Sequence, residues 1–244
     1  MPYVGSRGVR IHYELEGQGV PLVLQHGFTR SIESWIERGY VKELSRDCRL
    51  LLVDARGHGD SEKPHDPQAY SAELMTGDIA AVLDDLGIQK ANYWGYSMGG
   101  RIGFQLMRLY PSRCSSYIIG GMSPYPQASE EEERFVARLD TVTRLGALAN
   151  ALGLFDNDFK ALHAFRQNVS SWPATGGLLS SIGAPCLLYA GERDAFHDGV
   201  KEAAKHIQHA SFVSIPGLAH SETFFHSELI LPHVKSFLLS VTGK

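Results

Sequence analysis

The sequence contains few cysteines and no long apolar segment. Its three cysteines among 244 residues are an odd number without the paired spacing of a metal site. We expect them to be reduced and to pack inside the protein. No apolar run reaches the roughly 20 residues that a membrane-spanning helix needs, and the first residues lack the apolar core of a secretion signal. These absences predict a cytoplasmic protein with no membrane span, no metal and no organic cofactor.

Positive charge is neither abundant nor concentrated. Lysine and arginine number 23 against 27 aspartates and glutamates, which gives a formal net charge of −4. Binding to nucleic acid depends on clustered Lys and Arg, so we expect a small-molecule substrate and no nucleic-acid partner. Hydrophobic residues make up 43% of the chain, enough for an α/β domain with a sizeable buried sheet. Nothing in the sequence indicates the oligomeric state.

The segment 95–101, Gly-Tyr-Ser-Met-Gly-Gly-Arg, places Ser97 between two glycines. An apolar strand precedes it, and residues with helical spacing follow it as far as Pro111. A serine on a tight strand-to-helix turn projects away from the backbone, and its neighbours two positions away must be small. The pattern predicts Ser97 as a nucleophile. Because the same short motif also occurs in ordinary glycine-rich loops, the prediction needs support from elsewhere in the chain.

Three other predicted strand ends carry suitable groups. His26-Gly27-Phe28 follows the strand 22–25, and the backbone N–H groups of Phe28 and Met98 are the two donors that a developing oxyanion would need. Asp194 ends the segment 184–194, in which a strand leads into Gly-x-x-Asp. His220 ends the segment 213–220, in which a strand leads into a glycine-containing loop. A serine hydroxyl needs an imidazole to take its proton, and the imidazole needs a carboxylate to orient it. Asp198 lies close behind Asp194 and is the alternative acid.

These motifs, in the order Ser97, Asp194, His220, resemble the α/β-hydrolase superfamily over nearly the whole chain. The segment 54–61, Asp-Ala-Arg-Gly-His-Gly-Asp-Ser, is similar to the D-x-R-G-x-G-x-S turn of that family. The resemblance implies an α/β-hydrolase fold, with a mostly parallel sheet flanked by helices. It also implies a structural turn in which Asp54, Arg56 and Ser61 tie a loop beside the site, with His58 as a loop residue and not the base.

Strands and helices alternate over 1–122 and 182–244, which we predict to be the two parts of one core. A single helix is expected over 32–44, and a last helix over 229–239 with its start shifted by Pro232. Between 123 and 181 the alternation stops, and this segment is predicted to be a helical lid. Its aromatic residues Phe135 and Phe155, together with Trp35 of the core, are candidates to line a hydrophobic substrate pocket.

We therefore predict a carboxylic ester hydrolase that acts on a small to medium hydrophobic ester through an acyl-enzyme on Ser97. Haloalkane dehalogenases and soluble epoxide hydrolases resemble this fold but use an aspartate where this chain has Ser97. A lactone or C–C bond hydrolase with the same triad remains an alternative. The chain also resembles the menaquinone-pathway enzyme that eliminates pyruvate, in which case Tyr96 and Arg101 would take part in the site. An alternative of another class is a ligand-sensing receptor with this fold.

Overall fold

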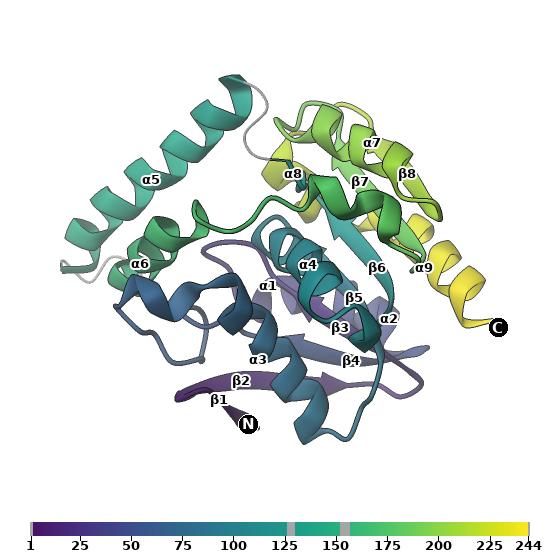
Figure 1. Cartoon of the computed structure of the whole chain (residues 1–244), viewed down its shortest axis with the longest axis horizontal. Helices are drawn as coiled ribbons and strands as arrows, with labels where there is room; N and C mark the ends of the chain where they lie inside the picture. Colours follow the sequence, from purple (N-terminus) through teal and green to yellow (C-terminus); the bar gives the residue numbers. More distant parts are fainter. Residues whose placement is uncertain (1, 126–129, 152–156, 244) are drawn as a thin grey trace.

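An eight-stranded sheet forms the centre of the protein (Figure 1). The structure is a computed structural model that describes residues 2–125, 130–151 and 157–243; it does not describe the side chains of 142, 144 and 147–151. The strands follow the order β1-β2-β4-β3-β5-β6-β7-β8. β1 and β2 pair antiparallel, as do β2 and β4, and all other pairings are parallel. The bounds are β1 Tyr3–Ser6, β2 Val9–Glu16, β3 Val20–Gln25, β4 Cys48–Val53, β5 Ala91–Tyr96, β6 Cys114–Gly120, β7 Cys186–Gly191 and β8 Ala210–Ile215.

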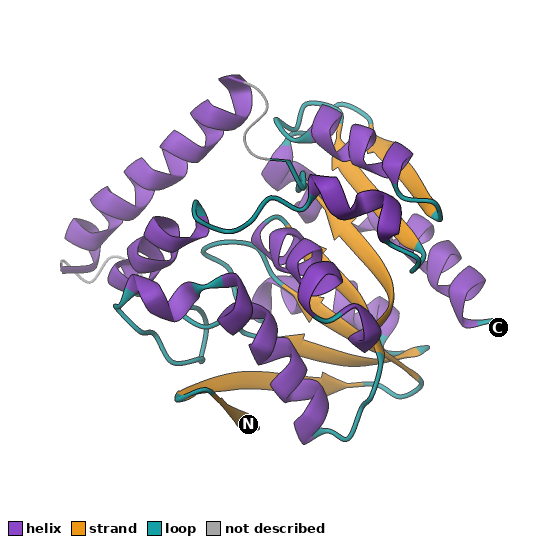
Figure 2. Ribbon diagram, viewed as in Figure 1, coloured by secondary structure: helices purple, strands orange, loops and turns teal. Residues whose placement is uncertain are grey.

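Helices cover both faces of the sheet (Figure 2). Because side chains alternate along a strand, Val23 faces one apolar cluster while Leu22 and Leu24 face the other. The first cluster also contains residues of α3 (Ala72–Asp85), α4 (Met98–Leu109) and α7 (His197–His206). The second contains residues of α1 (Glu33–Glu37), α2 (Tyr40–Leu44) and α9 (Ser227–Thr242). Burial on both faces explains why the central strands are continuous apolar runs. The predicted fold class is confirmed.

Several predicted boundaries were wrong. The helix expected over 32–44 is two helices, because Gly39 between them has φ 78° in the left-handed region. Pro232 lies inside α9, which begins five residues earlier and buries Ile230 and Val234 on either side of the proline. Strand β1 was not predicted; it has four residues, three of them at least partly exposed, and therefore lacks an apolar run. Helix α8 (His220–Phe225) was also not predicted.

Two helices, α5 (Glu130–Ala151) and α6 (Phe159–Val169), are inserted between β6 and β7 and lie against each other (Figure 1). Helix α6 packs on the core through Phe165, whose ring stacks on Phe28 at 5.5 Å and meets Trp172 edge-on at 6.0 Å. The short 3₁₀ helices are η1 Pro67–Tyr70, η2 Pro111–Arg113 and η3 Gly176–Ser181. No helix in the described part of the chain is both long and apolar enough to cross a membrane.

Candidate active site

Ser97 stands on a sharp turn between β5 and α4. Its backbone has φ 55° and ψ −111°, a conformation that is costly for a residue with a side chain. Its N–H donates to the Gly120 carbonyl at 2.8 Å, which ties the turn to β6. A Cβ on Gly95 would lie 2.2 Å from the Gly99 carbonyl oxygen, and one on Gly99 would lie 2.2 Å from the Gln25 carbonyl oxygen. Both glycines are therefore required by close backbone approach.

The structure brings Ser97, His220 and Asp194 into one hydrogen-bonded chain. The Ser97 Oγ lies 2.8 Å from His220 Nε2. His220 Nδ1 lies 2.9 Å from Asp194 Oδ2 and 3.0 Å from Oδ1. The buried carboxylate accepts the Nδ1–H, which leaves Nε2 unprotonated and able to accept the serine proton. The arrangement has the connectivity needed to activate a hydroxyl nucleophile.

The alternative acid, Asp198, takes no part in the hydrogen bonds that join Ser97, His220 and Asp194. Its side chain is fully exposed and lies 2.9 Å from His197 Nδ1. Asp194 is held in place by the loop after β7, where its Oδ1 also accepts the N–H of Phe196 at 3.0 Å. The position of Asp194 directly beyond a buried strand, rather than in the first turn of α7, explains why it and not Asp198 reaches His220.

The loop after β3 lies against the serine. A Cβ on Gly27 would be 3.5 Å from the Ser97 Cβ. Gly27 to Arg30 form a turn closed by the Arg30 N–H and the Gly27 carbonyl at 3.2 Å, with Thr29 at φ 64°. In the described part of the chain, the backbone N–H groups of Phe28 and Met98 donate to no protein acceptor. Both are therefore available as donors near Ser97.

A cavity of about 50 Å³ opens at Ser97, and we call it the Ser97 cavity. Tyr96 is one of its walls, but its hydroxyl donates to the His220 carbonyl and its ring lies 5.4 Å from the imidazole. Burial raises the pKa of Tyr96 well above its ordinary value, so the phenol stays protonated as this donor. The lining residues are Gly27, Phe28, Arg30, Tyr96, Ser97, His220, Ser221, Phe224 and Phe225. Proximity to Phe28 and His220 in the sequence was the available signal for the four that were not predicted: Arg30, Ser221, Phe224 and Phe225.

The prediction that Trp35 lines the pocket was wrong. Its side chain is completely buried, with its ring 5.0 Å from Phe224 and 5.1 Å from both Tyr40 and Trp94. It has no surface left for a substrate because α1 packs it into the apolar cluster beneath the site. Phe135 of α5 lies 4.7 Å from the His220 ring and lines an adjoining cavity of about 580 Å³ with it. Phe155 lies outside the described residues.

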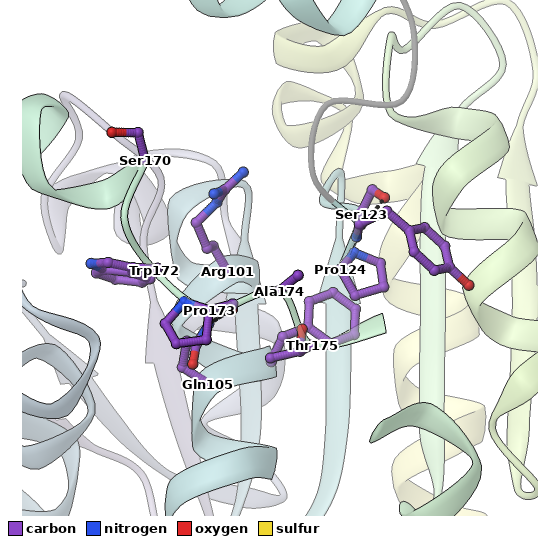
Figure 3. A pocket seen from close by; sticks show the side chains of 11 residues that line it. Arg101, Gln105, Ser123, Pro124, Ser170, Trp172, Pro173, Ala174 and Thr175 are labelled. Carbon is purple, nitrogen blue, oxygen red and sulfur yellow. Dashed lines mark hydrogen bonds between the residues drawn. The ribbon is translucent and has the colours of Figure 1, made fainter. Parts of the chain in front are cut away.

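Arg101 lies in the first turn of α4 but lines a different cavity, of about 150 Å³ (Figure 3). Figure 3 shows it between the 170–175 segment and the turn at Ser123 and Pro124. This cavity shares no lining residue with the Ser97 cavity. Burial lowers the pKa of Arg101, and the positive charge of Arg166 lowers it further, while Glu132 acts in the opposite sense. The structure therefore does not bring Arg101 to the same cavity as Tyr96.

Asp54 and Ser61 tie the turn of residues 54–61, as expected, whereas Arg56 bonds outside the turn. The Ser61 hydroxyl donates to the Asp54 carbonyl at 2.7 Å, and the Asp54 carboxylate lies 2.8 Å from His12 Nδ1. Arg56 does not contact the Asp54 carboxylate: its Nε and Nη2 donate to Asp78 of α3 at 2.7 and 2.6 Å. This buried bidentate pair connects the turn to a helical residue 22 positions further along, which no local motif indicated.

His58 is completely buried next to this turn. Its Nδ1 lies 3.2 Å from the Arg56 carbonyl, and its ring meets Phe28 edge-on at 5.7 Å. Burial, reinforced by the neighbouring His26, lowers the pKa of His58 to about 3, so the ring is neutral. It does not line the Ser97 cavity.

Comparison with known proteins identifies the family of the chain. The family model described as the alpha/beta hydrolase fold matches residues 20–169. The chain belongs to the α/β-hydrolase fold family. Within this family it is 26% identical over 269 residues to a Bacillus subtilis protein named 2-succinyl-6-hydroxy-2,4-cyclohexadiene-1-carboxylate synthase, with 97% of each chain covered.

Two further α/β-hydrolases extend the comparison. Mouse epoxide hydrolase 4 is 32% identical over 130 residues, which are 52% of this chain and only 35% of that protein. A thermophilic esterase from Thermogutta terrifontis superposes with a TM-score of 0.82 at 22% identity, covering 98% of both chains. At that identity the esterase demonstrates a shared fold and no more. The family match indicates an enzyme of the α/β-hydrolase superfamily, without fixing its reaction or its substrate.

Proposed function

We propose that this protein is a carboxylic ester hydrolase that works through an acyl-enzyme on Ser97. The single observation that carries the proposal is the hydrogen-bonded chain from the Ser97 hydroxyl through His220 to the buried Asp194. The strained backbone of Ser97 supports it, because such conformations persist where the surrounding structure positions a reactive group. The free N–H groups of Phe28 and Met98 supply the matching oxyanion donors.

The mechanism follows from these positions. The Ser97 oxygen attacks the ester carbonyl while its proton passes to His220 Nε2, and Asp194 stabilises the imidazolium. The N–H groups of Phe28 and Met98 stabilise the oxyanion of the tetrahedral intermediate. That intermediate collapses when the C–O bond to the alcohol breaks and His220 returns the proton to the leaving oxygen. A water molecule then attacks the acyl-enzyme by the same steps, which releases the acid and restores the serine.

The substrate is proposed to be an ester with a small acyl or alcohol group. The Ser97 cavity is narrow, and its walls include the rings of Phe28, Phe224 and Phe225. Segment 123–181, with α5 and α6, is proposed to act as a lid, since Phe135 of α5 packs directly on the His220 ring. An aromatic residue over the base would exclude water from the reacting atoms, which strengthens the electrostatic interactions there.

The proposal is tested with p-nitrophenyl esters of increasing acyl length and with a fluorophosphonate that forms a covalent adduct with activated serines. We expect hydrolysis of short-chain esters and one adduct per protein, located on Ser97 by peptide mass spectrometry. The imidazole within 2.8 Å makes this hydroxyl uniquely reactive among the serines of the Ser97 cavity. Heat-unfolded protein is the control and should remain unlabelled. Labelling at another serine, or no turnover of any ester, would refute the proposed function.

A second candidate is pyruvate elimination, the reaction of the menaquinone-pathway enzyme that the sequence resembles. It is favoured by full-length coverage of the Bacillus subtilis synthase and by the places of Tyr96 and Arg101 on either side of Ser97 in the sequence, although the two residues line different cavities. If the protein is such a lyase, Arg101→Ala should weaken release of pyruvate from the polycarboxylate substrate of that synthase at least tenfold more than it weakens p-nitrophenyl ester hydrolysis. Coupled pyruvate detection measures the first activity, and absorbance the second. Equal effects on both activities would exclude the lyase function.

A further inference from the structure

The Ser97 cavity has one permanently charged wall. Of its nine lining residues only Arg30 carries a fixed charge, and none is a carboxylate. The other walls are aromatic rings, glycine backbone, the hydroxyls of Ser97 and Ser221, and the imidazole of His220. A substrate in this cavity therefore encounters a guanidinium, which belongs to an exposed residue, beside otherwise uncharged walls.

The local structure holds Arg30 at this position. Its backbone N–H closes the turn that begins at Gly27, and the Asn157 side chain donates to the Thr29 carbonyl at 3.3 Å. The Arg30 guanidinium lies over the ring of Phe225, with 5.2 Å between its Cζ and the ring centroid. Phe225 ends the helix α8 that His220 begins. Arg30 thus belongs to the loop of the proposed oxyanion donor and contacts the helix that begins at the proposed base.

The charge of Arg30 is not neutralised within the protein. Among the described residues, no carboxylate lies within ion-pair distance of it, whereas Arg193 pairs with Glu222 at 3.1 Å and Arg113 pairs with Asp84 at 2.7 Å. The guanidinium lies over the Phe225 ring, and its N–H groups donate no hydrogen bond to any residue that the structure describes. A planar guanidinium with free edges matches the geometry of a carboxylate, which it can bind through two parallel hydrogen bonds.

We propose that Arg30 is a specificity-determining residue that binds a carboxylate on the substrate, so that the preferred substrates are esters that also carry a free carboxylate. This inference rests on the proposed ester hydrolysis at Ser97. Arg30 takes no part in bond breaking. It orients the substrate by holding the carboxylate at one end of the cavity while the ester carbonyl reaches Ser97.

Arg38 provides a matched control. Its guanidinium lies over the same Phe225 ring, with Cζ 4.3 Å from the centroid, so it makes the same kind of cation–π contact. It does not line the Ser97 cavity. If the arginines matter only because they hold Phe225 and α8, Arg30→Gln and Arg38→Gln should have similar consequences. If Arg30 binds a carboxylate, only its substitution should change the choice of substrate.

The test compares kcat/KM for two pairs of esters. Mono-p-nitrophenyl succinate and p-nitrophenyl pentanoate differ by a carboxylate in the acyl part, and 4-acetoxybenzoate and phenyl acetate differ by one in the alcohol part. In at least one pair, we expect Arg30→Gln to lower the anionic-to-neutral ratio about 10- to 100-fold, mainly through KM. That range corresponds to loss of a charge-assisted hydrogen bond. Arg30→Lys should keep more of the preference than Arg30→Gln, and Arg38→Gln should change the ratio less than about twofold.

Equal loss on anionic and neutral esters, or no preference for either anionic ester in the unsubstituted protein, would overturn the inference. Equilibrium binding tests the role of Arg30 independently of the proposed ester hydrolysis. The same anionic esters are titrated into Ser97→Ala and into Ser97→Ala with Arg30→Gln by calorimetry. At least tenfold weaker binding to the double variant supports the role of Arg30 even if the protein hydrolyses no ester. Equal affinity in the two proteins, or no binding to either, rejects it.

Discussion

Replacing Ser97 by alanine is expected to lower kcat for a short p-nitrophenyl ester by about 10⁴-fold or more. The alanine removes the only atom that can form the acyl-enzyme, while the available N–H groups of Phe28 and Met98 remain to bind the carbonyl oxygen. Some rate above that in water should therefore persist. Steady-state hydrolysis with purified protein measures the loss, and circular dichroism checks that the fold is retained.

Ser221→Ala is the control for this experiment, because Ser221 lines the same cavity and follows His220 directly in the chain. Its hydroxyl donates no hydrogen bond to the triad, so we expect its removal to change kcat by no more than a few-fold. A Ser97→Ala variant with nearly full activity would eliminate the acyl-enzyme mechanism. Comparable losses in both serine variants would indicate that the cavity shape, rather than the nucleophile, limits the rate.

Asp194→Asn is expected to lower kcat by about 10⁴-fold. An asparagine keeps the size of the side chain, but it cannot stabilise the imidazolium by charge. Its NH₂ group can also take the place of the carboxylate oxygen that accepts His220 Nδ1–H, which favours the tautomer with the proton on Nε2. That tautomer cannot accept the serine proton at the 2.8 Å contact. Hydrolysis rates across pH 5 to 9 measure the effect.

Asp198→Asn is the matched control, since it makes the same chemical change four residues away in a fully exposed side chain. Its rate should stay within about twofold of the unsubstituted protein, because the charge is screened by solvent. The opposite ranking, with a large loss at 198 and a small one at 194, would mean that the acid of the working enzyme is not the one placed beside His220 here.

Much of the fold could be predicted because its signals are local. The glycines at 95 and 99 are required by backbone contacts below 2.5 Å, and such contacts leave a readable pattern in the sequence. Apolar runs predicted seven of the eight strands. The positions of Ser97, Asp194 and His220 beyond three of these strands predicted that the residues would meet, since parallel strands end at one edge of a sheet. Their catalytic roles remain predictions.

Other features depend on contacts between distant segments and left no local signal. Trp35 is a large aromatic residue of the kind that often lines a pocket. Its packing against Tyr40, Trp94 and Phe224 turns it toward the sheet instead. The partner of Arg56 lies in α3, and only the tertiary structure brings Asp78 to it. The contact of Arg30 with Phe225, which lies 195 residues further along the chain, likewise could not be predicted from the sequence.

Ser97 and His220 follow strands that differ in the number of neighbouring strands with which they pair. Ser97 follows β5, which has paired strands on both sides, whereas His220 follows β8, the last strand of the sheet, which pairs only with β7. Peripheral strands open more readily than central ones. Ser97, the proposed nucleophile, thus follows a strand that is paired on both sides, and His220, the proposed proton acceptor, follows a strand at the edge of the sheet. Substitutions in β8 could change the position of His220, and with it the proposed proton transfer, without changing the turn at Ser97.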